Sequence, residues 1–176
     1  MRFLPSKLST SSGFSLVEAL VAVVLIGIFA AIAIPSWQNL LIQQRVSRAQ
    51  AQAYQAFRRA KFNAKREKRD WLVSFRENNS RVEYAVHRSS ADPLWQALTA
   101  DAEFLEIDTD NTTLSTSKST CNNFYCVKFT HKGTIGGRLG RITLGHKNKS
   151  QPKQCIFISS LLGTLRRDEA EGCIEP

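Results

Sequence analysis

The first 70 residues divide into a continuous apolar run and a segment in which apolar and polar residues alternate. The apolar run extends from Leu16 to Ile34, and Glu18 is the single charged residue within it. At a rise of about 1.5 Å per residue, a helix of about 20 residues is about 30 Å long, which is the hydrocarbon thickness of a bilayer. The run therefore predicts a helix for an apolar environment, in which the Glu18 carboxylate requires a compensating group.

After Pro35 the pattern becomes that of an amphipathic helix. Arginines and glutamines occupy one face, and the apolar residues that recur at steps of three and four are Trp37, Leu40, Leu41, Ala49, Ala53, Ala56, Phe57 and Ala60. We predict one long helix from about Phe14 to Arg66, bent near Pro35 because proline removes an N–H donor and clashes with the preceding turn. Its second half is expected to cover a globular domain.

From Trp71 onward the hydrophobic period shortens to two, which predicts strands. Residues 71–88 are expected to form two strands around a turn at 77–80, and residues 92–98 a loop or short helix. Further strands are expected within residues 103–108, 123–133, 137–147 and 154–167, with a polar loop at 108–120. The predicted class is α+β: a long N-terminal helix packed on a C-terminal antiparallel β domain.

The charge balance indicates an acidic partner. The 176 residues include 24 Lys and Arg against 15 Asp and Glu, a formal net charge of +9. Such an excess suits nucleic acid, another polyanion or an anionic membrane surface. The densest basic run, Arg58 to Arg69, has two interpretations, a solvated helix face or a contact for an anionic partner.

All four cysteines, Cys121, Cys126, Cys155 and Cys173, lie in the C-terminal third. An even number in a segment that would be exported fits two disulfides formed in an oxidising compartment. Of the three possible pairings, Cys121–Cys126 with Cys155–Cys173 closes the shortest loops and is preferred. Zinc is the alternative, but no histidine lies near these cysteines in a ligand pattern. We expect no metal and no cofactor.

The sequence does not predict an enzyme. Its histidines, His87, His131 and His146, are scattered, and it contains no nucleotide-binding glycine loop, HExxH or GxSxG motif.

The apolar N-terminal run allows three interpretations: a secretory signal cut after Ala31-Ile32-Ala33, a signal anchor, or a span that a dedicated peptidase trims before Phe14. Glu18 and the length of the run count against the first. The positive-inside rule does not choose a topology, because two basic residues precede the run and two follow it at similar distance.

The stretch from Gly13 to Pro35 resembles the class III signal of type IV pilins and type II secretion pseudopilins. In that family a short basic leader ends in glycine, phenylalanine follows, and glutamate is the fifth residue after the cut. Gly13, Phe14 and Glu18 match these positions, and Pro35 matches the family's helix-bending proline. The resemblance implies that prepilin peptidase cleaves between Gly13 and Phe14 and methylates the new amine of Phe14.

The resemblance also implies a pilin fold in four segments. These are a leader (1–13), a transmembrane and filament-core helix (14–35), its amphipathic half (36–70) and a β-rich globular domain (71–176). The implied partners are other pilins or pseudopilins, the prepilin peptidase and an inner-membrane assembly platform. The implied localisation is the bacterial inner membrane, with the globular domain in the periplasm, and then a pilus or pseudopilus.

Two shorter motifs are similar to the GspH/FimT branch, which contains the type II secretion minor pseudopilin H and related T-type minor pilins. Phe129 to Gly133 matches its F-x-x-x-G strand and turn. Gly163 to Arg167 falls where the branch has Gly-Arg-x-Arg, although Thr164 replaces the first arginine. This similarity implies a minor pilin or pseudopilin that primes or caps a filament, rather than a major pilin.

Some T-type minor pilins bind DNA during natural transformation, which implies a second role, the capture of double-stranded DNA for uptake. Arginine and lysine contact phosphates without reading sequence. The candidate contacts are Arg166, Arg167, Arg138, Arg141, Lys147 and Lys149. The alternative for Arg166 is an ion pair with one of the acids that follow it.

Overall fold

The computed structural model describes residues 15–147 and 153–174. It divides into two units, Met1–Gln38 and Asn39–Pro176. Helix α1 (Leu16–Glu67) begins in the first unit and ends in the second, close to the bounds expected from the sequence. Pro35 lies within α1, and the bend expected there remains a prediction. Gly13, Phe14 and Lys149 lie outside the described residues.

The described part of the first unit is the apolar half of α1. Its side chains are exposed in the unit taken by itself: Leu16 is 80% exposed and Phe29 is 69% exposed. Glu18 is exposed as well. Within the described residues, no helix combines the length and the apolarity needed to cross a membrane.

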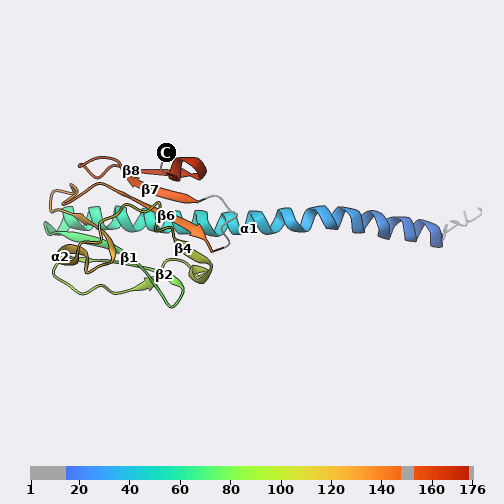
Figure 1. Ribbon diagram of the computed structural model, residues 1–176, viewed down its shortest axis with the longest axis horizontal. Helices are drawn as coiled ribbons and strands as arrows, with labels where there is room; N and C mark the ends of the chain where they lie inside the picture. The colour runs from blue at the N-terminus through green and yellow to red at the C-terminus, as the bar shows by residue number, and fades with distance from the viewer. Residues whose placement is uncertain (1–14, 148–152, 175–176) are drawn as a thin grey trace, which may run out of the picture. The chain divides into compact units, whose positions relative to one another are not determined.

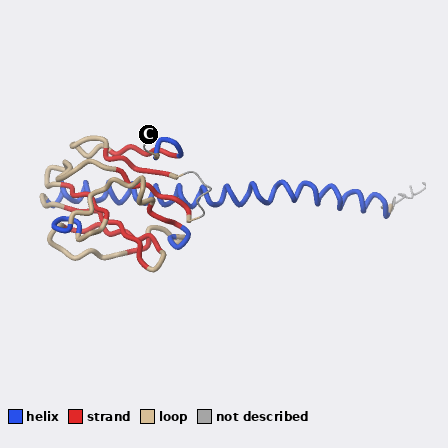
Figure 2. The backbone as a smooth tube through the Cα atoms, in the orientation of Figure 1, coloured by secondary structure: helices blue, strands red, loops and turns tan. Residues whose placement is uncertain are grey.

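The second unit contains two four-stranded antiparallel sheets, which flank the second half of α1 in the view of Figure 1 and appear as two groups of strands in Figure 2. The first sheet has the order β3-β2-β1-β5, with β1 (Trp71–Asn78), β2 (Arg81–Arg88), β3 (Gln96–Ala97) and β5 (Tyr125–Phe129). The second has the order β4-β6-β7-β8, with β4 (Leu105–Ile107), β6 (Arg141–His146), β7 (Gln154–Ile158) and β8 (Leu165–Glu169). The short helices are η1 (Ala102–Phe104), α2 (Lys118–Cys121) and η2 (Ala170–Cys173).

Most strands lie where the hydrophobic period predicts them, with two differences. The stretch expected to be a single strand at 154–167 is a hairpin, because the chain turns between Ile158 and Leu165 and the N–H of Ser159 donates to Thr164 O at 2.9 Å. The segment expected to be a loop or short helix contains the edge strand β3, which pairs with β2.

Small side chains on α1 allow both sheets to pack closely against it. Five buried alanines follow one another at steps of three and four: Ala49, Ala53, Ala56, Ala60 and Ala64. Phe57, which is fully buried, is the large side chain on this face and lies 5.5 Å from Phe75 between ring centroids. Trp37, Leu40 and Leu41 belong to the predicted apolar stripe but are 63%, 45% and 39% exposed, so the buried stripe is shorter than the sequence pattern.

Two disulfides fix the ends of strands. Cys121 pairs with Cys126, which ties α2 to β5, and Cys155 pairs with Cys173, which ties β7 to η2. This is the pairing preferred from the sequence. Because all four thiols are joined in disulfides, they are not available as thiolate ligands for zinc.

Replacing Phe57 by alanine should lower the free energy of unfolding of the protein by about 3–5 kcal/mol, because it leaves a cavity between α1 and β1. Phe62 is a matched control on the same helix, since its side chain is 61% exposed. Phe62→Ala should change stability by less than about 0.5 kcal/mol. Urea unfolding followed by circular dichroism measures both, and equal losses would contradict the assigned core.

Candidate functional site

The second unit has a groove between α1 and the β7–β8 hairpin. The groove has a volume of about 450 Å³, and its lining residues are Tyr54, Arg58, Lys61, Phe62, Lys65, Gly163, Thr164 and Leu165. Three of these eight residues are cationic and none of the eight is acidic. Arg58 and Lys65 are exposed. The groove therefore concentrates positive charge beside two aromatic rings, a combination that suits an anionic ligand.

Lys61 holds the hairpin against the helix. Its Nζ donates to the carbonyl oxygens of Leu162 at 2.8 Å and Gly163 at 2.9 Å. Partial burial lowers the pKa of Lys61 from its ordinary value, and the nearby charge of Lys65 lowers it further. Lys61 thus positions the turn, while Arg58 and Lys65 line the groove and are exposed.

Two glycines pack against each other near the groove, and one of them, Gly163, lines it. Gly163 has φ +69°, and a Cβ there would lie 3.2 Å from Gly133 O and 3.2 Å from the Phe129 ring. Gly133 has φ +76°, and a Cβ there would overlap the Lys65 side chain. Because L side chains rarely adopt these conformations, both positions favour glycine. The two motifs found separately in the sequence, one ending at Gly133 and one starting at Gly163, therefore meet next to the groove.

The two arginines of β8 do not form one cationic pair. Arg167 lies with its guanidinium carbon 5.0 Å from the ring centroid of Tyr54 on α1, beside the groove. Arg166 lies 4.8 Å from the Phe157 ring on β7 and 3.5 Å from Asp168 Oδ2. Successive residues of a strand point to opposite faces of a sheet, which separates the two side chains. Only Arg167 adjoins the groove, and the ion pair of Arg166 matches the alternative kept from the sequence.

The remaining candidate cations are also dispersed. Arg141 is buried, because the loop before α2 folds over β6 and the Nε of Arg141 donates to Asn111 O at 2.7 Å. Lys147 donates to Ser80 O and Glu103 O. Arg138 is exposed in the connection between β5 and β6 and lines a different small cleft, which also contains the Cys121–Cys126 disulfide. The described residues among these candidates therefore do not lie together in one site.

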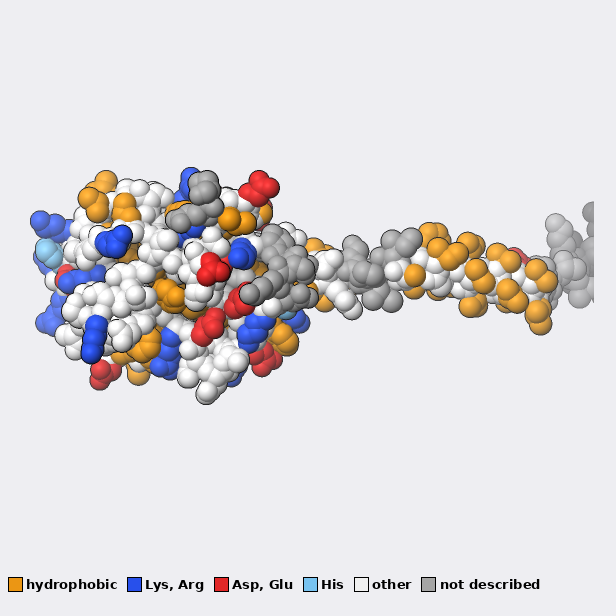
Figure 3. All heavy atoms as spheres, viewed as in Figure 1, with side chains coloured by type: hydrophobic (Ala, Val, Ile, Leu, Met, Phe, Trp, Pro, Cys, Tyr) orange, Lys and Arg blue, Asp and Glu red, His pale blue; other side chains and the backbone are white. Residues whose placement is uncertain are grey.

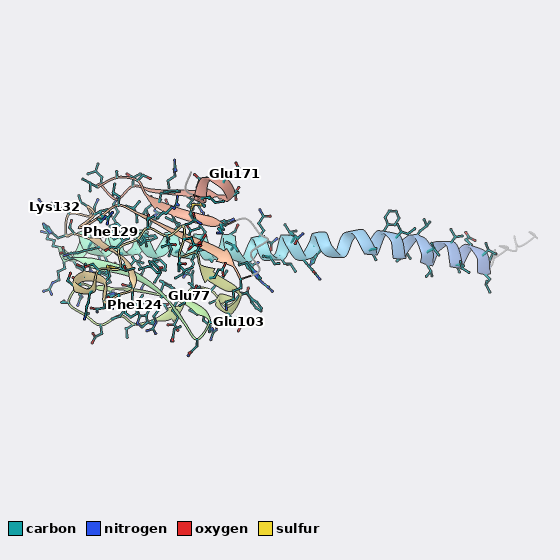
Figure 4. The ribbon with its side chains drawn as sticks, in the orientation of Figure 1. Glu77, Glu103, Phe124, Phe129, Lys132 and Glu171 are labelled. Atoms are coloured by element: carbon teal, nitrogen blue, oxygen red, sulfur yellow. A yellow bond between two sulfur atoms is a disulfide. The ribbon has the colours of Figure 1, made fainter. Side chains whose placement is uncertain are left out.

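Cations gather at one end of the second unit, the left end in Figure 3. Figure 4 places Lys132 at this end, and it places Glu103 and Glu171 toward the opposite end. The two acids near the end of α1 in this region are both paired with cations, Glu67 with Arg88 and Asp70 with Lys128. Asp70 is 2.9 Å from Lys128 Nζ, and this hydrogen bond holds the pKa of Asp70 below its usual value against the opposing effect of partial burial. Positive charge therefore dominates this end of the unit.

Sequence reasoning identified Arg167 but did not place the α1 residues in the site. The signal was present, because Arg58, Lys61 and Lys65 recur at steps of three and four, which puts them on one helix face. That face was interpreted as a solvated surface or an anionic contact. The sequence did not show that this helix face packs beside the β7–β8 turn, whose position depends on Lys61 and Gly163.

Comparisons with known proteins concern a limited part of the chain. Residues 8–34 match the model of the prokaryotic N-terminal methylation motif. Three sequences named type IV major fimbrial protein FimA, from Dichelobacter nodosus, are each 45% identical to the chain over 47 residues, which is 27% of this chain and 29–30% of theirs. The chain thus covers less than a third of the length of these curated relatives. No solved structure matches the chain.

Replacing Gly163 by alanine should lower the free energy of unfolding by about 1–3 kcal/mol, because the left-handed backbone is strained for a residue with a Cβ. Gly137 is the matched control, since nothing lies within 4 Å of a Cβ built there. Gly137→Ala should stay within about 0.5 kcal/mol of the unmodified protein. Thermal or urea unfolding tests this, and an unchanged midpoint for Gly163→Ala would contradict the role of this glycine.

Proposed function

We propose that this type IV pilin-like protein is a minor pilin or pseudopilin that assembles into a pilus or secretion pseudopilus and primes or caps it. The observation that carries the proposal is the methylation motif at residues 8–34, joined to a helix half whose apolar side chains are exposed. Exposed apolar side chains along a whole helix half are favourable only in lipid or among similar helices. The proposed role is structural and requires no catalysis.

Glu18 would direct the assembly. A carboxylate near the centre of an apolar helix in a bilayer costs about 2.5–3.5 kcal/mol on insertion scales, and less near the interface. Cleavage between Gly13 and Phe14 would create a methylated, positively charged amine on Phe14. We infer that this amine of one subunit neutralises Glu18 of its neighbour, which removes the penalty and fixes the register. An alternative is that Glu18 reaches the headgroups from its place one turn inside the run.

The proposed course follows from this chemistry. The prepilin peptidase trims the leader, residues 14–35 hold the protein in the inner membrane with the globular domain in the periplasm, and an assembly platform transfers it to the filament. A minor role is proposed because the motif residues Phe129, Gly133 and Gly163 resemble the GspH/FimT branch. The similarity to a major fimbrial protein covers 27% of the chain. It therefore supports a pilin in general and does not favour the major role.

Glu18→Ala should leave processing at Gly13–Phe14 intact but reduce incorporation of the protein into filaments at least about tenfold, because the pair with the neighbouring amine is absent. Ser15→Ala is the control, since it removes a polar group in the same turn without removing a charge. Mass spectrometry of the N-terminus and immunoblots of sheared filaments from the producing bacterium measure the two steps. Normal incorporation of Glu18→Ala, or a mature protein starting at Ile34, would overturn the proposal.

A second candidate function is the binding of double-stranded DNA during uptake. The groove supports it, because Arg58, Lys65 and Arg167 lie beside Tyr54 and the described residues that line the groove include no acid. Cations at such a surface neutralise phosphates without reading sequence, and each neutralised phosphate steepens the dependence of binding on salt. If DNA binds here, the geometry of the groove therefore favours Arg58 and Lys65 on α1 as its contacts, rather than the pair Arg166 and Arg167 on β8 that the sequence suggested.

If DNA binds in the groove, Arg58→Ala/Lys65→Ala should weaken binding of duplex DNA. The slope of log affinity against log salt should also fall by about 0.9 for each phosphate that is no longer neutralised. Arg81→Ala/Lys118→Ala is a control that removes the same charge outside the groove. Fluorescence anisotropy with the full chain held in phosphatidylcholine nanodiscs measures both variants at several salt concentrations. No binding at low salt would leave the structural role alone, and equal weakening in both variants would show that DNA does not bind in the groove.

A further inference from the structure

The tip of the β7–β8 hairpin displays two large apolar side chains. Leu161 is 62% exposed and Leu162 is 71% exposed, and Phe62 on the adjacent face of α1 is 61% exposed. Turn residues are normally small or polar, and the flanking Ser159, Ser160 and Thr164 follow that rule. Adjacent exposed leucines in a turn, near an exposed aromatic ring, form an apolar patch that the described residues leave uncovered.

The backbone that carries these leucines is held by hydrogen bonds at several points. The N–H of Ile135 donates to Leu161 O at 2.8 Å, and Lys61 donates to the next two carbonyl oxygens. Within the turn, the N–H of Gly163 donates to Ser160 O at 2.9 Å. The leucines are thus presented by a fixed turn. A partner that covers them spends little free energy on ordering the loop, because the backbone is already fixed.

Positive charge surrounds the apolar tip. Arg58 and Lys65 line the adjoining groove, and Lys132 precedes Gly133, which packs against Gly163 at the base of the hairpin. These three side chains are exposed. The acids nearest in sequence, at the far end of β8, begin with Asp168, which pairs with Arg166 on the other face of the sheet. The surface therefore combines protruding apolar groups with cations beside them.

We propose that this surface docks on an anionic lipid membrane, with Leu161, Leu162 and Phe62 entering the interface and the neighbouring cations among the lipid phosphates. Apolar insertion combined with basic side chains is the pattern that binds anionic bilayers, in which each cation near the surface contributes about 1 kcal/mol. A nucleic acid backbone would use the cations but offers no apolar layer for two leucines. The docking is separate from the proposed filament role and uses a different part of the chain.

The test uses the full chain in phosphatidylcholine nanodiscs, so that the apolar half of α1 is already embedded. These discs are floated with target vesicles of phosphatidylcholine alone or of phosphatidylcholine with phosphatidylglycerol. The discs should bind only the vesicles that contain phosphatidylglycerol. Leu161→Ser/Leu162→Ser should reduce this binding about tenfold, since two interfacial side chains are removed.

Leu94→Ser/Leu139→Ser is the matched control, because these leucines are 84% and 41% exposed elsewhere on the unit. Its binding should equal that of the unmodified chain, and the thermal midpoints of both variants should be unchanged. Absence of binding to anionic vesicles overturns the proposal. Equal binding by Leu161→Ser/Leu162→Ser also overturns it, and if duplex DNA then displaces the vesicles, the groove is a general polyanion site. Failure of the Glu18 experiment would leave the lipid result unaffected.

Discussion

The close approach between the second half of α1 and the two sheets is the constraint on which the rest of the globular unit depends. A stripe of alanines removes side-chain bulk from one face of the helix, so that Val73, Phe75 and Ile156 reach it from both sheets and form one core. With larger residues in the stripe, the sheets would be forced outward and the turn between β7 and β8 would move away from Lys61. The groove forms because the alanine face of α1 lets the β7–β8 hairpin come close to the helix, and the neighbouring helix face carries the basic residues.

Local periodicity was sufficient to predict the main elements. The helix pattern ends within a residue of the observed end of α1, and the alternation from Trp71 predicted the β1–β2 hairpin. The turn of that hairpin needs two left-handed residues, and Asn79 and Ser80 adopt φ values of 47° and 59°. The hairpin at 154–167 was missed because apolar residues lie on both sides of its turn, which hides the signal of Ser159, Ser160 and Gly163.

The pattern of apolar and polar residues does not determine which strands pair, or which residues are covered by other segments of the fold. Arg166 and Arg167 are adjacent in sequence, but only the pairing of β8 with β7 determines which of them faces α1. Arg141 looks like a surface cation, yet the loop before α2 covers its face of β6, and both Arg141 and Thr143 donate to Asn111 O. The exposure of Leu40 and Leu41 has a related cause, because a helical stripe is buried only where a sheet extends far enough to cover it.

The Cys155–Cys173 disulfide has a mechanical consequence. Strand β8 lies at the edge of its sheet and would be the first to unzip if tension were applied through η2. The covalent bond carries such a load directly from η2 to β7, whose neighbours on both sides share it, and so bypasses the ladder between β7 and β8. Under such a load the globular unit would thereby keep its edge strand, and the groove beside that strand, in place.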